Sequence, residues 1–347
     1  MADVLSRKKD GSITESRSLR IGFLGVGKVA LEHAITLKRL GQEVVAGCAT
    51  DVGSPRWRSF VAVAKGARFE SDGEALLNDP DIDAIVACLP WNVTGAWLPR
   101  LLTTPKPVLI EKPIALSSRA AEAALSTPGA KPHNKIVGFN RRFYAPVQQL
   151  KERLGQGGLK AVEMNISETL QRLHTHYGPE VIPHAVIYSS SHILDTAIYL
   201  LGSLTPVRVY GYEEKGYPLP FRSLTGLLET REGLPVTFSI NADNPVPVGL
   251  RLYFDDKTTW HLSPMERLVA YRGYEVIEAT PKMRIQKFMP RPFFESVADA
   301  TLKPGCLEQM RAFTTGEGKE IAATPAESVE LLRFIEALYN VHPSDPI

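Results

Sequence analysis

The sequence has little that would place the protein in a membrane, outside the cell or on a nucleic acid. Only three cysteines occur in 347 residues, Cys48, Cys88 and Cys306, and they are far apart and odd in number. We interpret them as free thiols in a reducing compartment, the cytoplasm. No apolar run is long enough to span a bilayer. The formal net charge of +2 gives no electrostatic basis for binding nucleic acid or a membrane surface.

The composition supports folded domains preceded by a tail. Apolar residues make up 44% of the chain, enough to bury cores, and the length favours two domains. Residues 1–18 are rich in charge and serine and contain no hydrophobic segment. They predict a disordered tail and not a secretory signal.

Strand-like and helix-like patterns alternate over residues 19–140. The apolar strand LRIGFLGVG ends in glycines, and KVALEHAITLKRLG follows with apolar residues at helical spacing. The later strand patterns EVVAGCA, DIDAIVACLP, PVLIEKP and KIVGFN are separated by helical ones. This alternation predicts right-handed βαβ units and a doubly wound parallel sheet, a Rossmann domain of the α/β class.

Strands with few helices between them follow residue 140. Two segments predict hairpins, LTGLLETREGLPVTFSINA through Glu232-Gly233 and LRLYFDDKTTWHLS through Asp255-Asp256. Residues 141–347 are therefore expected to form an α/β domain with a mostly antiparallel sheet. A last helix is expected over 325–341, because Thr324 and Glu327 have capping-box spacing.

Gly25-x-Gly27-x-x-Ala30 lies between the first strand and the first helix. Gly25 would allow a tight turn, and Gly27 would let the backbone approach a pyrophosphate. Ala30 would let helix and strand pack closely. The phosphate would sit at the helix start, beside Lys28 and Val29, where free N–H groups and the helix dipole favour anions. The loop predicts binding of NAD(P)(H) over a plain glycine turn.

The end of the second strand bears on the choice of cofactor. An acid there would bind the ribose 2′-OH of NAD, whereas arginine or small hydroxyl residues suit the 2′-phosphate of NADP. The strand ends near Ala49, and Asp51 comes slightly later. The candidates for the second case are Thr50, Ser54, Arg56 and Arg58. The balance slightly favours NADP, and a solvated turn without a ligand is the alternative.

Glu111-Lys112-Pro113 ends a later strand of the predicted parallel sheet. Ligands of such sheets bind outside the carboxyl ends of the strands, so Lys112 would face the nicotinamide end of the crevice. It could hydrogen-bond a substrate hydroxyl and stabilise oxyanion charge. Pro113 would fix the backbone that aims it. A surface ion pair at a strand end is the alternative.

Four stretches, GFLGVGKVA, EKPIALS, GFNRRFYAPVQQLK and SSSHILD, resemble in order and spacing the Gfo/Idh/MocA family of oxidoreductases. This family includes glucose–fructose oxidoreductase and inositol 2-dehydrogenase. The resemblance spans Leu19 to the last helix. It implies an N-terminal Rossmann domain and a C-terminal domain whose largely antiparallel sheet mediates homodimers or homotetramers. It also implies a substrate between the domains and no metal.

The family's second signature is Asp, three residues, His, two residues, Asp. His192 and Asp195 match it, but Tyr188 stands where the first carboxylate is usual. On a helix the three residues would share a face by their i, i+4, i+7 spacing. Neutral His192 would accept a proton as hydride leaves the substrate, since histidine titrates near physiological pH. The Tyr188 phenol is a poorer base but could donate to a carbonyl.

Position and resemblance add further site residues. Additional cofactor contacts are expected from Leu89, Pro90, Trp91 and Glu111. Substrate contacts are expected from Asn140, Arg141, His184, His192 and Asp195. One arginine of NRRF would hold the domain geometry by an ion pair. His174 and His176 have no matching metal ligands, so we expect a substrate-lining loop there.

These features predict an NAD(P)-dependent oxidoreductase. It would move a hydride to or from a carbinol or carbonyl carbon of a sugar, cyclitol or sugar nucleotide. One alternative is a relative that uses tightly held NAD in hydrolysis, elimination or epimerisation. Another is a non-catalytic nucleotide-binding paralogue, which Tyr188 favours. An imine or enone reductase would share the same scaffold.

Overall fold

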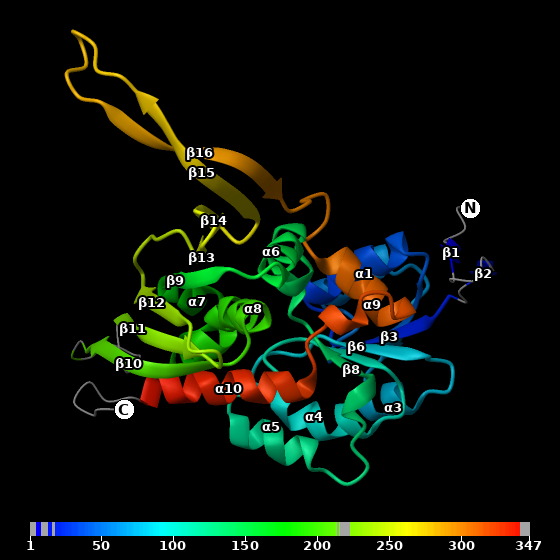
Figure 1. Ribbon diagram of the computed structural model, residues 1–347. Helices are drawn as coiled ribbons and strands as arrows, with labels where there is room; N and C mark the ends of the chain where they lie inside the picture. The colour runs from blue at the N-terminus through cyan, green and yellow to red at the C-terminus, as the bar shows by residue number, and fades with distance from the viewer. Residues whose placement is uncertain (1–4, 8–12, 16–17, 214, 216–222, 341–347) are drawn as a thin grey trace. The chain divides into compact units, whose positions relative to one another are not determined.

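The computed structural model describes residues 5–7, 13–15, 18–213, 215 and 223–340 (Figure 1). Contacts divide the chain into two compact units, 1–143 with 300–332 and 144–299 with 333–347. Near the start of the chain, β1 (Leu5–Arg7) and β2 (Ile13–Glu15) pair as antiparallel strands. The remainder of the predicted disordered tail, up to residue 17, lies outside the described residues.

The first unit is built on a six-stranded parallel sheet with the order β5-β4-β3-β6-β7-β8 (Figure 1). Counted along the chain, this is the order 3-2-1-4-5-6 of a dinucleotide-binding Rossmann fold. Its strands are β3 (Arg20–Leu24), β4 (Glu43–Cys48), β5 (Arg68–Glu70), β6 (Ala84–Ala87), β7 (Val108–Ile110) and β8 (Lys135–Val137). The predicted doubly wound sheet is therefore confirmed.

Helices cover both faces of this sheet, with α1 and α9 on one side and α4 and α5 on the other (Figure 1). Its helices are α1 (Lys28–Arg39), α2 (Pro55–Val63), α3 (Gly73–Asn78), α4 (Thr94–Thr103), α5 (Ser118–Leu125), α9 (Cys306–Thr315), η1 (Pro132–Asn134), η2 (Asn140–Phe143) and η5 (Lys319–Ile321). Capping side chains fix the starts of three of these helices. A backbone N–H of the first turn donates a hydrogen bond to the Ser54 hydroxyl in α2, to the Asp72 carboxylate in α3 and to the Ser117 hydroxyl in α5.

The segment 300–332 returns from the C-terminal half to complete the first unit. Arg142, which is only 2% exposed, pairs with Glu327 at 2.8 Å. Glu327 also closes the predicted capping box, because its Oε2 accepts from the Thr324 N–H at 2.8 Å and its own N–H donates to Thr324 Oγ1 at 3.2 Å. These contacts hold the start of α10 (Pro325–Asn340) on the unit, since a buried cation is costly to leave unpaired.

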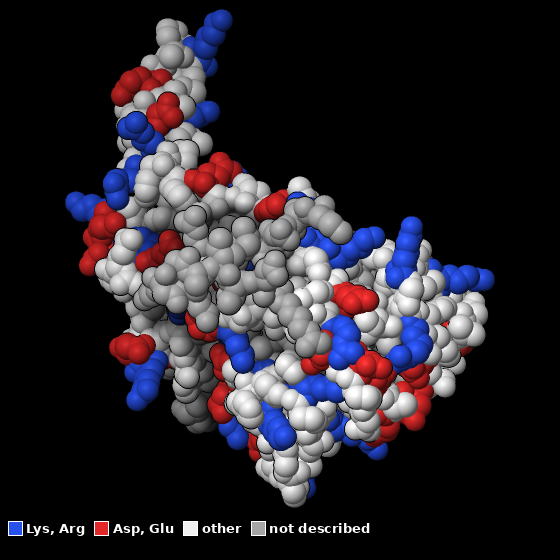
Figure 2. Space-filling view, turned by 90° about the vertical axis from the view of Figure 1, so that its right-hand side faces the viewer, with Lys and Arg blue, Asp and Glu red and all other residues white. Residues whose placement is uncertain are grey.

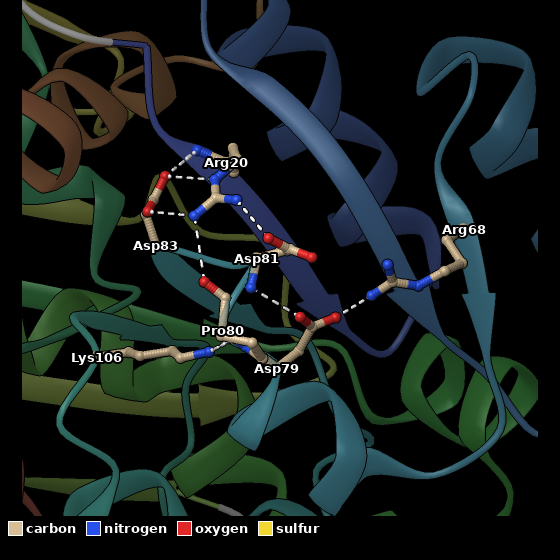
Figure 3. Close-up of polar contacts among 7 residues, drawn as sticks. All are labelled: Arg20, Arg68, Asp79, Pro80, Asp81, Asp83 and Lys106. Carbon is tan, nitrogen blue, oxygen red and sulfur yellow. Dashed lines mark hydrogen bonds and ion pairs between the residues drawn. The ribbon is translucent and has the colours of Figure 1, made fainter.

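The amino ends of the strands are joined by a network of charged side chains (Figure 3). Arg20, at the start of β3, bonds both carboxylate oxygens of Asp83 at 3.1 and 3.2 Å and Asp81 at 2.9 Å. Arg68, at the start of β5, pairs with Asp79, whose Oδ1 also accepts the Asp81 N–H at 2.8 Å. Single exposed pairs contribute little, but a bidentate network fixes the strand starts opposite the glycine loop.

The second unit is built on an eight-stranded sheet with the order β10-β11-β12-β9-β13-β14-β15-β16, in which only β12 and β9 pair in parallel. Its strands are β9 (Leu159–Glu168), β10 (Leu204–Tyr212), β11 (Ser223–Thr230), β12 (Pro235–Ala242), β13 (Gly249–Phe254), β14 (Thr258–Leu262), β15 (Arg267–Ile277) and β16 (Lys287–Val297). Both predicted hairpins are present, β11–β12 and β13–β14. The mostly antiparallel sheet is therefore confirmed.

Apart from α10, the helices of the second unit pack against its sheet or one another. They are α6 (Ala145–Gly155), α7 (Leu170–Tyr177), α8 (Ser191–Leu201), η3 (Pro179–His184), the π-helical turn η4 (Val186–Ser190) and the end of α10. His174 and His176 lie on α7, so the loop expected there is wrong. Buried Leu170 and Leu173, three residues apart, give this stretch an apolar helical face.

Strands β15 and β16 extend beyond the rest of their sheet as a two-stranded arm (Figure 1). Tyr274 pairs with Pro290 and Val276 with Phe288, which places these four side chains on one face of the arm. Tyr274 is 67% and Phe288 59% exposed. Charged side chains of both signs also project from the arm (Figure 2). No pattern in the sequence predicted this extension.

Lys135 is a buried lysine at the start of β8, 1% exposed. Its Nζ donates hydrogen bonds to the carbonyl oxygens of Thr104 and Lys106, both at 2.8 Å, and to Asn134 Oδ1 at 2.6 Å. Burial lowers the pKa of Lys135 from 10.5 to about 8, and repulsion from Lys131 adds to this shift. The amine therefore loses its proton in the folded protein at a lower pH than in the unfolded chain.

This difference predicts a pH-dependent stability. Between pH 8 and 10.5 the unfolded chain keeps a proton that the folded protein has lost, so the free energy of unfolding rises with pH. Relative to Lys135→Met, the wild type should gain about 1 kcal/mol between about pH 7.5 and 9. Urea unfolding of both proteins at the two pH values measures this difference. The titration of cysteines affects both proteins equally, so it cancels when the two changes in the free energy of unfolding are subtracted. Parallel pH profiles for the two proteins would contradict the prediction.

Candidate functional site

The glycine loop lies where the strand order of the first sheet reverses, between β3 and β6. Gly25 has a φ of +94°, and its N–H donates to the carbonyl oxygen of Cys48 at 3.0 Å. A Cβ on Gly25 would lie 2.4 Å from the carbonyl oxygen of Cys88. Only glycine fits both this conformation and this space, so the loops after β3 and β6 lie in contact.

Gly27 begins α1 as its N-cap residue, in an extended conformation with a φ of −73°. A Cβ there would meet no atom within 4 Å. Ala30 is fully buried, Lys28 is exposed and Val29 is half-buried. No side chain caps α1 and no acidic residue lies in its first turn. The helix start therefore leaves its N–H groups open for an anion. Binding of a pyrophosphate there stays a prediction.

The turn after β4 carries the residues expected to select the cofactor. Asp51 Oδ1 accepts the Gly53 N–H at 2.7 Å, and Ser54 Oγ accepts the Trp57 N–H at 3.2 Å. These two side chains thus stabilise the turn and the start of α2. Thr50, Arg56 and Arg58 are exposed, and so is Asp51. Two guanidinium groups therefore lie on this surface, whereas the carboxylate of Asp51 bonds its own backbone.

The loop after β6 is a tight turn on the same edge of the sheet. The Cys88 N–H donates to the carbonyl oxygen of Leu24 at 2.8 Å, which continues the pairing of β6 with β3. Pro90 accepts hydrogen bonds at its carbonyl oxygen from the N–H groups of Val93 and Thr94, at 2.8 and 3.1 Å. The other two predicted cofactor residues of this loop, Leu89 and Trp91, are half-buried.

Lys112 follows the carboxyl end of β7, the next strand of the sheet. The Glu111 N–H donates to the carbonyl oxygen of Ala87 at 2.9 Å, which fixes the backbone just before Lys112. Lys112 is half-buried. The glycine loop, the turn after β6 and Lys112 thus occupy the carboxyl ends of three adjacent strands, where ligands of this fold bind.

Glu111 makes a contact that the sequence did not reveal. Its Oε1 lies 2.6 Å from Nε2 of His33, a fully buried residue of α1. Burial by itself would raise the pKa of Glu111, but the hydrogen bond and charge of His33, together with nearby lysines, lower it. In the sequence, the one sign of this contact is that His33 is a polar residue on the same apolar helix face as Ala30 and Leu37. The predicted cofactor role of Glu111 stays a prediction.

The residues of the second signature lie in one segment of the second unit. Tyr188 belongs to the π-helical turn η4, while His192 and Asp195 lie one turn apart on α8. The π turn interrupts the regular i, i+4, i+7 face that the sequence predicted. The Tyr188 ring packs at 4.9 Å on the ring of Tyr177. His184, at the end of η3, has a pKa lowered by burial.

A buried carboxylate that the sequence did not indicate lies beside this segment. Glu168, at the end of β9, is 1% exposed. Its Oε1 accepts hydrogen bonds from the hydroxyl of Ser190 and from the Ser190 N–H, the latter at 3.1 Å. A carboxylate at the start of a helix is favoured by the helix dipole. Glu168 therefore fixes the start of α8, two residues before His192.

The residues predicted at the end of the first domain have structural partners there. Asn140 is 4% exposed, and its Nδ2 donates to the carbonyl oxygen of Pro304 at 2.8 Å. Arg142 pairs with Glu327 inside the first unit, whereas Arg141 is half-buried. Substrate binding by Asn140 and Arg141 stays a prediction.

Among the described residues, no three histidine, cysteine, aspartate or glutamate side chains are grouped in a way that could hold a metal ion. No described helix is both long enough and apolar enough to cross a membrane.

Comparison with known proteins adds to this geometry. Residues 19–140 match the model of the oxidoreductase family with an NAD-binding Rossmann fold. The chain is 27% identical over 318 residues to inositol 2-dehydrogenase 2 of Saccharopolyspora erythraea, covering 88% of this chain and 91% of that protein.

Solved structures show the same fold. An oxidoreductase from Thermotoga maritima superposes with a TM-score of 0.72 at 16% identity, covering 93% of this chain and 96% of that one. A 3-ketoreductase from Actinomadura kijaniata, in complex with TDP-benzene and NADP, gives a TM-score of 0.64 at 16% identity, covering 93% and 98%. The predicted fold class is confirmed by these likenesses together with the sheet topology.

The two glycines of the loop predict opposite effects of substitution. Gly25→Ala would press a Cβ against the Cys88 carbonyl in a left-handed conformation, and should lower the free energy of unfolding by about 2 kcal/mol or more. Gly27→Trp should leave stability nearly unchanged, because the site is open and φ is ordinary. It should nevertheless abolish nucleotide binding by filling the space at the helix start.

Urea unfolding and fluorescence titration with NADH and NADPH separate the two effects. Unchanged affinity of Gly27→Trp for both nucleotides would overturn the dinucleotide assignment. Loss of folding in Gly27→Trp would contradict the open space around its Cα.

Proposed function

Residues 19–140 belong to the Gfo/Idh/MocA family of oxidoreductases, and from this we propose a specific activity for the chain. It is an NAD(P)-dependent dehydrogenase or reductase that transfers a hydride to or from a carbinol or carbonyl carbon of a sugar, cyclitol or sugar nucleotide. One observation carries the proposal: the glycine loop and Lys112 share the carboxyl edge of a sheet with Rossmann strand order. The inositol dehydrogenase and ketoreductase relatives support the substrate class.

The proposed roles follow from the chemistry of each side chain. Bound NAD(P)(H) accepts or supplies the hydride at its nicotinamide ring. Lys112 donates a hydrogen bond to the substrate oxygen and stabilises its negative charge. His192 takes the hydroxyl proton during oxidation and returns it during reduction. Tyr188 orients the substrate through its phenol, and His184 and Asp195 line the substrate on the same segment.

Removal of either proton-handling group tests this mechanism. Lys112→Ala and His192→Ala should each lower turnover by about two orders of magnitude, the range of lost acid–base or oxyanion contributions. Nucleotide affinity should survive in both variants. Tyr188→Phe should cost less than His192→Ala if the phenol only orients the substrate. Steady-state kinetics on a panel of polyols and sugar nucleotides provides the measurement, and turnover near wild type in Lys112→Ala would refute the mechanism.

A different chemistry is the second candidate, since Tyr188 replaces a carboxylate of the family signature. Such a protein would hold NAD tightly as a transient oxidant in hydrolysis, elimination or epimerisation, or would bind nucleotide without catalysis. Substrate conversion without net change in nucleotide absorbance would support the first form. Mass spectrometry of the native protein reveals retained nucleotide.

We further propose that the protein uses NADP at least as well as NAD. The exposed guanidinium groups of Arg56 and Arg58, beside the hydroxyl of Thr50, suit a 2′-phosphate. The hydrogen bond from the Gly53 N–H to Asp51 Oδ1 supports this choice, because this carboxylate oxygen is then occupied within its own turn and not by the ribose of NAD.

Cofactor choice gives a separate prediction. The wild type should bind NADPH at least as tightly as NADH. Arg56→Ala should weaken NADPH binding about tenfold and leave NADH binding nearly unchanged, since only NADPH carries the extra phosphate. Asp51→Ala is the matched control, for which neither affinity should fall strongly. A strong NADH preference that disappears in Asp51→Ala would show that Asp51 binds the ribose and that the protein uses NAD.

Association into a homodimer or homotetramer through the second sheet also belongs to the proposal. Its support is the arm of β15 and β16, which presents Tyr274, Val276, Phe288 and Pro290 on one exposed face. Two-stranded ribbons are marginal in water without cover on one face. Pro290 and Pro292 lie on the edge strand β16 and disfavour further strand pairing there, so this face and not the strand edge would form the contact.

A further inference from the structure

Tyr177 and Tyr188 form an aromatic pair within the second unit. Their ring centroids lie 4.9 Å apart and the ring planes are tilted by 59°, a geometry in the range of favourable aromatic contacts. Tyr177 is the last residue of α7, and Tyr188 lies in the π-helical turn η4, four residues before His192. The pair therefore joins a helix that the proposed mechanism does not use to the segment that carries its candidate base.

The start of α7 is anchored to the ends of two strands. Asp243 directly follows β12 in a left-handed conformation with a φ of +58°, and its Oδ1 accepts the Leu170 N–H at 2.9 Å. The Asp243 N–H donates to the carbonyl oxygen of Glu168, at the end of β9, at 2.7 Å. A carboxylate from a distant segment thus caps the helix in place of a local residue. The helix that ends in Tyr177 is therefore held on the sheet.

The contact between the two rings leaves a large part of Tyr177 uncovered. Leu170 and Leu173 form the buried stripe of α7, and Tyr177 continues this stripe but is 46% exposed. Tyr188 is half-buried. A single exposed aromatic side chain is ordinary at a protein surface. Here the exposed ring continues onto a second ring, and the two together give an apolar surface close in the chain to His192.

We propose that Tyr177 determines specificity by packing, together with Tyr188, on the apolar face of the substrate ring. Aromatic side chains bury the C–H groups of a saturated ring favourably, whereas a hydroxyl pressed against them loses water without gaining a partner. The pair therefore favours a ring that lacks a hydroxyl on this face, a deoxy sugar or deoxycyclitol, over the fully hydroxylated parent. This deepens the proposed function and rests on its placing of the substrate beside Tyr188 and His192.

Hydroxyl-radical footprinting with mass spectrometry tests the contact in the wild-type protein. The probes are parent rings and their monodeoxy forms, D-galactose with 6-deoxygalactose and myo-inositol with the monodeoxyinositols. NADH or NADPH is present throughout, since neither can oxidise an alcohol. A deoxy probe should lower the oxidation of Tyr177 about threefold, because bound ligands are mostly enclosed, and its parent should lower it less. Tyr210 on β10, 48% exposed, is the matched reference and should be oxidised equally in every sample.

Variants separate ring packing from hydrogen bonding, with affinities measured by saturation-transfer NMR titration. Tyr177→Ala should weaken binding of the protecting deoxy probe about tenfold, since the apolar contact is lost. Tyr177→Phe keeps the ring and should bind like the wild type. Tyr188→Asp replaces a ring by two acceptor oxygens and should reverse the preference in favour of the hydroxylated parent. Tyr210→Ala is the matched control and should bind every probe normally.

These measurements leave no outcome undecided. If no probe protects Tyr177 in the wild type, or if Tyr177→Ala and Tyr210→Ala bind the probes equally well, the proposal is wrong. Should Tyr177→Ala fail to fold, Tyr177→Leu keeps the apolar stripe without the ring and should lose the same affinity.

Failure of this inference can be distinguished from failure of the proposed function, because neither footprinting nor titration requires turnover. Protection of Tyr177 without any hydride transfer would refute the proposed activity and uphold the binding surface. Turnover of a probe that leaves Tyr177 unprotected would refute this inference alone.

Discussion

The close approach of two loops at the reversal of strand order is the constraint on which the first unit depends. The carbonyl oxygen of Cys88 would lie 2.4 Å from a side chain on Gly25. Because no side chain intervenes, the chain after β3 turns directly into α1, and the turn after β6 lies against it. The start of α1, with its free N–H groups, is thereby fixed at the carboxyl edge of the sheet. Lys112 reaches the same edge through the pairing of β7 with β6.

The two ends of this sheet differ in what their polar groups do. At the amino ends, Arg20 and Arg68 bond carboxylates of the loop before β6, and the network holds the strands in register (Figure 3). At the carboxyl ends, Gly27 leaves the helix start open, and the His33–Glu111 pair lies below the surface. At the amino edge the charged groups therefore bond one another, whereas the carboxyl edge keeps exposed groups that can bind a ligand. This division matches the use of strand carboxyl ends for function in open α/β sheets.

Local sequence patterns predicted those parts of the fold that neighbouring residues determine. The alternating strands and helices of the first unit, the two hairpins of the second and the capping box at Thr324 all depend on short-range periodicity or turn chemistry. The return of residues 300–332 to the first unit depends on long-range contacts such as Asn140 with Pro304, 164 residues apart, which no local pattern encodes. The arm of β15 and β16 escaped prediction because its apolar side chains face outward, so its strands lack the alternation of a half-buried sheet.

The same distinction separates the site residues. Lys112 and His192 were predicted as site residues because they belong to short motifs, whereas His33 and Glu168 form hydrogen bonds with partners 78 and 22 residues away. The structure gives Tyr188 a context that the motif alone lacks. Although the phenol replaces a carboxylate, a buried carboxyl group close in the chain to each candidate catalytic residue is held by a distant partner, Glu111 by His33 and Glu168 by Ser190. Hydrogen bonds between separate elements therefore fix the backbone just before Lys112 and the start of the helix that carries His192.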